Sequence, residues 1–261
     1  GWNSMPGYVL IRILFHQMLV YRKNFVFNLI YLFANFIFII FFWECLFTFV
    51  EIDQWSIQDI GLYSIMVNLA ASFIEIFFGL TQLPELILRG EFDYYLCKPG
   101  NVFFKLIYQN MNILYVLQGL ILNGVMFIVC ITVIPYSFTI SEFIFSLLLL
   151  VEGVVIYELF MVTIIAFSFR LEKIEWLINS FWTVSELKQY PASLFNRTIQ
   201  NILLVVLPIS IMYYYPTAVL IGKVKMTSDL FLMIQSILFL MFMLAYLSWT
   251  INKKKFTSNG G

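Results

Sequence analysis

Six long apolar runs limit the fold of this chain more than any other feature of its sequence. Each run is continuously apolar rather than alternating, and each reaches or exceeds the ~20 residues that a helix needs to cross the hydrocarbon layer of a membrane. Helices are expected rather than strands, because every backbone polar group must be satisfied within its own run. The predicted spans are Phe25–Val50, Ile57–Leu80, Leu106–Ile134, Phe143–Phe169, Ile199–Leu220 and Leu230–Ile251.

Composition supports a membrane protein and excludes several other classes. The chain is 62% hydrophobic and 11% charged, whereas a soluble domain is about half apolar and about 25% charged. Its formal net charge is zero, so no basic domain is available to bind nucleic acid. Cys45, Cys97 and Cys130 do not have the spacing of a metal site. We therefore expect an all-α membrane protein with a single domain over residues 1–261.

The positive charges predict how the spans are oriented. With six spans, thirteen lysines and arginines fall on one side of the membrane and only Lys223 and Lys225 on the other. Cytoplasmic loops carry such an excess, so both termini are predicted to be cytoplasmic. We expect the membrane to be the plasma membrane of a prokaryote. The thirteen are Arg12, Arg22, Lys23, Arg89, Lys98, Lys105, Arg170, Lys173, Lys188, Arg197, Lys253, Lys254 and Lys255.

Three further segments are predicted not to span the membrane. Tyr8–Arg22 is short and amphipathic, which is typical of a helix lying in the cytoplasmic interface. Lys173–Tyr190 is also amphipathic and is predicted to end before Pro191. Between the fifth and sixth spans we expect the chain to kink and partly re-enter the membrane, or else to form an ordinary aromatic belt. The residues behind that expectation are Pro208, Tyr213, Tyr214, Tyr215 and Pro216.

The loop between the second and third spans predicts a compact element with two faces. Pro84 opens a short helix there and Gly90 can end it. Phe92, Tyr95 and Leu96 then form a second apolar face, and the Pro99-Gly100 pair forces a turn. The loop therefore either fits a cleft on a soluble partner or simply connects two spans along the headgroups.

Part of this loop resembles a known family. The string Arg89-Gly90-Glu91-Phe92-Asp93-Tyr94-Tyr95-Leu96-Cys97-Lys98-Pro99 is similar to the signature of small ABC-2-type permeases. In that family a basic residue, a glycine, an acidic residue, an apolar residue and an aspartate precede Leu-x-Lys/Arg-Pro. The stretch from Tyr190 through Pro208 to Pro216 is similar to the family's fifth-span region.

This resemblance implies a transporter subunit without its own ATPase. Such a subunit, usually of an exporter, pairs with a second permease subunit and with two cytoplasmic ATPase subunits, which bind the ATP and Mg. It also implies an elbow helix near the N-terminus, re-entrant helices before the last span, and a coupling loop that docks on the ATPase. The sequence has no G-x-x-x-x-G-K-[ST] phosphate loop, so we expect no cofactor and no enzymatic activity in this chain alone.

Roles for the loop residues follow from the implied docking. Phe92, Tyr95 and Leu96 are expected to be apolar anchors, since aromatic side chains are enriched at the energetic centres of interfaces. Gly90 and Pro99 would fix the backbone direction. The charged residues expected to orient the docked loop are Glu91, Asp93 and Lys98, and Arg89 also belongs to the expected coupling loop.

Acidic residues within the spans leave one alternative function open. A charge at the centre of the membrane is costly, so Glu44, Glu75, Glu152 and Glu158 should face protein, water or an interface. The candidates for a transport pathway or an interface are Glu44, Glu75, Pro208, Tyr213, Tyr214, Tyr215 and Pro216. An ion- or proton-coupled secondary transporter would need such acids to converge at mid-depth. Glu152 and Glu158 are six apart and so lie on different faces of a helix.

Overall fold

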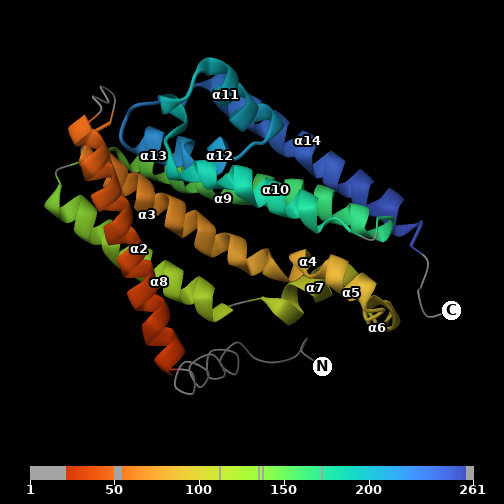
Figure 1. The fold of residues 1–261 in the computed structure, drawn as a ribbon. Helices are drawn as coiled ribbons and strands as arrows, with labels where there is room; N and C mark the ends of the chain where they lie inside the picture. Colours follow the sequence, from red (N-terminus) through yellow and green to blue (C-terminus); the bar gives the residue numbers. More distant parts are fainter. Residues whose placement is uncertain are drawn as a thin grey trace.

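A computed structural model describes residues 22–49, 55–111, 113–134, 136, 138–171 and 173–256, and throughout these the chain is helical or irregular without strands. The helices form an elongated bundle, in which the last residues of α14 (Ser228–Lys253) lie at the same end as α5 (Leu83–Leu88) and α6 (Phe92–Cys97) (Figure 1). The predicted interfacial helix over Tyr8–Arg22 lies outside these residues except for its last one. We call the end that carries α5 and α6 the loop end of the bundle.

Within the described residues, five helices are long and apolar enough to cross a membrane, and a sixth crossing is reached if one bent helix pair is counted. This result confirms the predicted class of fold. The third of these helices starts at Ile113 rather than at the predicted Leu106. The second continues past the predicted end at Leu80 and into the loop that follows. The five are α2 (Arg22–Phe49), α3 (Ile57–Ile74) continued through η2 (Glu75–Phe77), α4 (Phe78–Thr81) and α5 (Leu83–Leu88), α8 (Ile113–Val133), α9 (Ile140–Ile165) continued by η3 (Ala166–Phe169), and α14 (Ser228–Lys253).

Helix-capping side chains set where three of these helices begin. Ser56 and Asp59 form a reciprocal capping box at the start of α3, and Thr139 and Glu142 form a second one at the start of α9. Thr227 accepts a hydrogen bond from the backbone of Leu230 at the start of α14. These polar caps satisfy backbone N–H groups that the first turn of a helix leaves without partners.

The prediction that the third span begins at Leu106 is wrong. A separate helix, α7, covers Val102–Asn110, and the backbone is extended at Met111 before α8 begins. One face of α7 is buried at Leu106 and Ile107, whereas Tyr108 on another face is 74% exposed. An apolar run interrupted in this way contains one amphipathic helix and one spanning helix, which a count of apolar residues merges.

Residues 175–189 cross the bundle, although we predicted an amphipathic stretch that does not span. α10 (Glu175–Ser185) and the 3-10 turn η4 (Glu186–Gln189) run alongside α9 (Figure 1). Phe181 packs on Tyr157 of α9 at 5.0 Å between ring centroids. Further along, the carbonyl of Lys188 accepts a hydrogen bond from Tyr63 near the start of α3. Together α10 and η4 rise by about 25 Å, which is close to the thickness of the hydrocarbon layer.

The chain then forms a hairpin that enters and leaves at the end of the bundle opposite the loop end. Its limbs are the helical stretches Arg197–Val206 and Ser210–Leu220, which meet at 95°. Before the first limb, Ser193 accepts a hydrogen bond of 2.8 Å from the Trp55 indole. After the second limb, Lys223 pairs with Asp59 at 3.0 Å. Because Trp55 and Asp59 both lie at the start of α3, this hairpin is re-entrant.

The predicted kink is therefore confirmed, but Ile199–Leu220 is not a fifth span. The bend falls at Leu207 and Pro208, where proline removes a backbone donor and cannot continue the helix. The elements are α11 (Arg197–Asn201), the π-helix η6 (Ile202–Val206), α12 (Ser210–Tyr213) and α13 (Tyr215–Leu220), preceded by η5 (Ala192–Leu194).

This topology changes the charge count but not its sign. Lys188 and Arg197 follow the crossing made by α10, so they belong to the end opposite the loop end. Moving two of the thirteen residues leaves eleven basic residues on the side of the loop end and four on the other. The excess still favours a cytoplasmic position for the loop end.

Helix α9 is the centre of the packing and contacts α14, α13, α12, α10 and α3. A Cβ built on Gly153 of α9 would lie 2.3 Å from the Met212 Cα atom of α12, so only glycine permits this approach. Small residues allow helices to pack closely in a membrane, where the hydrophobic effect gives little drive for association.

Candidate functional site

The loop predicted to dock on a partner is a hairpin of two short helices, α5 (Leu83–Leu88) and α6 (Phe92–Cys97). Gly90 has φ +72°, the left-handed conformation that glycine adopts without strain. Glu91 N–H donates to the Leu86 carbonyl at 2.9 Å, and Gly90 N–H donates to the Ile87 carbonyl at 3.1 Å. This pair of hydrogen bonds is a Schellman motif, which ends α5 and turns the chain directly into α6.

Polar contacts fix the far side of the hairpin. The Lys105 ammonium of α7 donates to the carbonyls of Tyr95 and Lys98, where α6 ends before Pro99. The Lys98 ammonium lies 3.8 Å from the centre of the Tyr94 ring, a cation–π contact. Arg89 pairs with Glu85 one turn earlier, but both side chains are 62% exposed, so this pair adds little stability.

An aromatic cluster joins the hairpin to the ends of two spanning helices. Phe92 is fully buried and packs edge-on against Phe169 of η3, at 5.3 Å, and against Phe256 after α14, at 5.1 Å. Phe169 also packs on Trp249 of α14 at 5.3 Å. The hairpin cannot move as a unit without disturbing the ends of α9 and α14, because these rings fill one common core.

This burial corrects the expected roles of two residues. Phe92 and Tyr95, predicted as anchors for a partner, are 0% and 7% exposed and face the chain's own core. Leu96, at 40%, remains exposed as predicted. The two buried rings are three residues apart, which places them on one face of α6, and the bundle covers that face.

The exposed face of the hairpin contains residues that sequence reasoning missed. Tyr94 and Leu88 are 60% and 47% exposed and lie near Leu96 in sequence. Glu85, Arg89 and Glu91 are also exposed, so apolar and charged side chains alternate there. Helical spacing could have placed Tyr94 opposite Phe92, but which face is buried depends on η3 and α14, far along the chain. We call Glu85, Leu88, Arg89, Glu91, Tyr94 and Leu96 the docking face.

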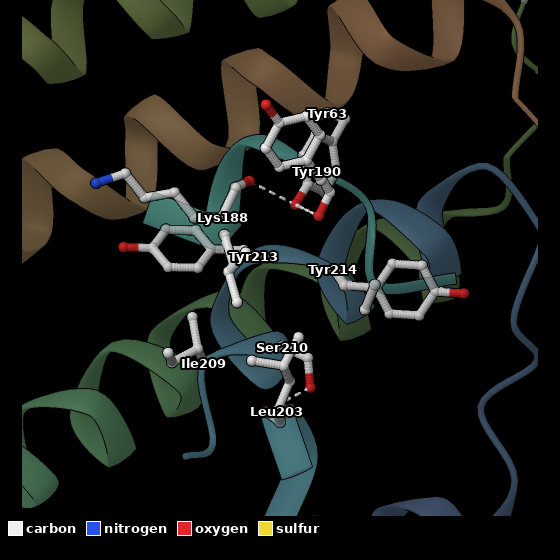
Figure 2. A pocket seen from close by; sticks show the side chains of 10 residues that line it. Tyr63, Lys188, Tyr190, Leu203, Ile209, Ser210, Tyr213 and Tyr214 are labelled. Carbon is white, nitrogen blue, oxygen red and sulfur yellow. Dashed lines mark hydrogen bonds between the residues drawn. The ribbon is translucent and has the colours of Figure 1, made fainter. Parts of the chain in front are cut away.

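Two of the five residues predicted near the re-entrant hairpin line a very small cavity. Figure 2 shows Tyr63, whose hydroxyl donates to the carbonyls of Lys188 at 2.7 Å and Tyr190 at 3.2 Å. Tyr213 and Tyr214 line the same cavity, and the Ser210 hydroxyl donates to the Leu203 carbonyl. The cavity volume is about 10 Å³, roughly enough for one water molecule. The Tyr63 hydrogen bonds join α3 to η4 and the residue after it, and the Ser210 hydrogen bond joins the two limbs of the re-entrant hairpin.

The other predicted residues of this region do not share one role. Pro208 is buried at the bend, and Pro216 is buried in the first turn of α13, where a missing N–H costs no hydrogen bond. The Tyr215 ring packs on Tyr214 at 5.2 Å between centroids. The three consecutive tyrosines are therefore packing residues within the chain.

The spanning acids are dispersed through the bundle. Glu44 is exposed on α2, whereas Glu75 is half-buried in η2 and Glu158 is buried in α9. Glu152 accepts a hydrogen bond of 2.8 Å from Gln235 of α14. Glu152 and Glu158 do point to different surroundings, as their spacing predicts. No group of three histidine, cysteine, aspartate or glutamate side chains in the described part of the chain could hold a metal ion.

The fold and the hairpin define a class of protein: a polytopic helical membrane protein with a two-helix hairpin at one end and a re-entrant hairpin at the other. A sequence profile described as ABC-2 family transporter protein matches residues 29–260, most of the chain. The chain belongs to this ABC-2 family of transporter proteins. No curated protein and no solved structure matches the chain significantly.

Proposed function

We propose that this chain is the permease subunit of an ATP-binding-cassette exporter, and that separate ATPase subunits drive it through the α5–α6 hairpin. The observation that carries the proposal is the connection between the docking face and Phe92. An exposed surface suited to a soluble partner lies on one side of α6, and the side chain buried on the other side packs on the ends of α9 and α14.

Force on the hairpin would pass to the spanning helices through this aromatic core. Closely packed cores transmit a displacement rather than absorbing it. Nucleotide binding brings the two ATPase subunits together and moves the hairpin, and η3 and the end of α14 then move with Phe92. Binding of a partner shifts a conformational equilibrium only if its affinity differs between the two states. The docking face would supply the contact whose affinity differs between the two states. The ATPase subunits would hold the ATP and Mg.

The transporter also needs a second permease subunit, identical or homologous to this one. Helix α2 supports this part of the proposal because few of its residues are buried by the rest of the chain. Phe27, Phe38 and Phe41 on α2 are each more than 60% exposed. A second subunit packed on α2 would enclose a pathway between the two permeases.

Co-purification tests the proposal. The tagged chain is isolated from its own cells in mild detergent, and the retained ATPase is quantified for the wild type and for Tyr94→Ala and Glu91→Lys. An aromatic side chain at the centre of an interface contributes about 2 kcal/mol, so Tyr94→Ala should reduce the apparent affinity about thirtyfold. Glu91→Lys should also reduce it, because it reverses a charge on the docking face.

Tyr108→Ala is the matched control. Tyr108 is a similarly exposed tyrosine on α7, but it lies outside the hairpin. Its variant should retain as much ATPase as the wild type. Equal retention in all variants, or no ATPase with the wild type, would overturn the docking role.

A further inference from the structure

An open groove runs between α7, α9 and α14 on the side of the bundle, near the loop end. Its volume is about 930 Å³, at the upper part of the range of roughly 300–1,000 Å³ for small-molecule sites. The body of the groove is apolar and aromatic, with Phe103, Leu159, Phe242 and Trp249 among its lining residues. A long hydrocarbon chain fits such a surface.

The mouth of the groove is cationic. Lys253 and Lys254, at the end of α14, both line it, and none of the lining residues is acidic. Within the described residues, neither lysine forms an ion pair with a carboxylate. Two ammonium groups at one end of an apolar groove complement a molecule with an anionic head and a hydrocarbon tail.

The depth of these residues places the mouth at the headgroup level. Trp249 and Tyr246 also line the groove, one and two turns before the lysines respectively. Tyrosine and tryptophan are enriched where a membrane meets water, and lysine side chains extend toward the headgroups from the ends of spanning helices. The apolar body therefore lies within the acyl region of the bilayer.

We propose that this groove binds an anionic phospholipid of the inner leaflet. Its phosphate would lie between Lys253 and Lys254, and an acyl chain would lie along Phe103, Phe242 and Trp249. Basic pockets between spanning helices on the cytoplasmic side are suited to anionic headgroups. A zwitterionic lipid would fill the apolar body equally well, but its headgroup has no net negative charge to balance the two lysines.

The proposal predicts a preference for negative charge that depends on these two lysines. The full chain, purified with any subunits that accompany it, is stripped of lipid and titrated with phosphatidylglycerol or with phosphatidylcholine of the same acyl chains. Bound lipid is counted by native mass spectrometry, and thermal unfolding is followed in parallel, since a ligand that binds only the folded state raises its stability. Wild-type protein should bind and be stabilised by phosphatidylglycerol preferentially.

Charge-neutral variants locate the site. Lys254→Gln should weaken phosphatidylglycerol binding about fivefold, and Lys253→Gln with Lys254→Gln about thirtyfold, at the usual strength of one lysine beside an anionic lipid. Lys255→Gln removes the same charge from the next residue, which is exposed but does not line the groove, and should change binding less than twofold.

Three results would overturn the proposal. The first is equal binding of the two lipids by the wild type. The second is a loss of phosphatidylglycerol binding with Lys255→Gln as large as the loss with Lys254→Gln. The third is the formation of dimers of this chain through the groove in place of bound lipid. Because lipid binding is read without nucleotide or transport, these outcomes do not depend on the proposed ATPase partner.

Discussion

At the scale of single residues, Gly90 is the position where backbone geometry matters most for the hairpin. Its φ of +72° is required by the turn between α5 and α6, and a Cβ there would meet no atom within 4 Å. A substitution would therefore act through backbone strain alone. Gly222 has the same φ at the other end of the bundle and equally open surroundings, so the chain contains its own control for strain.

Gly90→Ala should lower the free energy of unfolding by about 1–2 kcal/mol, the usual cost of placing a residue with a Cβ in the left-handed region, and should reduce the amount of bound ATPase. Gly222→Ala should destabilise the chain to the same degree but leave ATPase binding intact. Chemical unfolding in detergent and co-purification provide the two measurements. Loss of ATPase binding in both variants would show that strain at any site, rather than the shape of the hairpin, is responsible.

Substitutions at Phe92 and Tyr94 should distinguish the contribution of α6 to stability from its contribution to binding of the ATPase. Phe92→Ala removes a fully buried ring and should cost about 3–5 kcal/mol of stability. Tyr94→Ala should change stability by less than about 0.5 kcal/mol, as is usual for exposed positions, while it weakens the association with the ATPase. The thermal unfolding midpoint of each purified variant checks this. A large loss of stability with Tyr94→Ala would contradict the division of α6 into a buried and an exposed face.

At the scale of elements, the sequence predicted the long helices and the bend but misplaced one crossing. Continuous apolar runs identify α2, α9 and α14 because only lipid or a core can cover them. A search for long apolar runs does not identify α10 and η4 as a crossing, because these elements are short and begin with Glu175 and Glu186. Likewise, the family-like string located the hairpin, but the burial of Phe92 depends on Phe169 and Phe256, which no local pattern reveals.

The revised topology predicts which sides of the membrane react with a thiol reagent that cannot cross it. In a background without other cysteines, Gln189→Cys and Lys225→Cys should be labelled from outside intact cells. The native Cys97, exposed in the hairpin, should react only after the cells are opened. All three positions are exposed in the structure. If Gln189→Cys reacted only after the cells are opened, as Cys97 should, while Lys225→Cys reacted from outside, the result would restore Ile199–Leu220 as the fifth span.

The close approach of α9 and α12 makes a separate prediction. Gly153→Ala would place a Cβ 2.3 Å from the Met212 backbone, and such overpacking costs about 1–3 kcal/mol. Gly124→Ala in α8 is the matched control, because a Cβ there meets nothing within 4 Å and alanine favours a helix over glycine. Unfolding midpoints should fall for Gly153→Ala only. A similar midpoint for both variants would show that the two helices are less closely packed than the structure describes.

At the scale of the whole molecule, the two ends of the bundle have different organisation. The loop end has an exposed docking face supported by an aromatic core, and the opposite end is closed by the re-entrant hairpin against α3. Helix α2 is left largely uncovered by its own chain. The proposed function requires such an asymmetry, because the subunit would receive movement at the loop end and pair with a second subunit along α2.

The most direct test of the central claim is photo-crosslinking from position 94 in living cells. A photoreactive amino acid replaces Tyr94 in the tagged chain, and the crosslinked product is identified by mass spectrometry. The same group at position 246, on the lipid-facing groove, is the control. The account predicts a crosslink from position 94 to an ATPase subunit that carries a phosphate-binding loop, and none from position 246. Crosslinks from position 94 only to lipid or to unrelated proteins would contradict it.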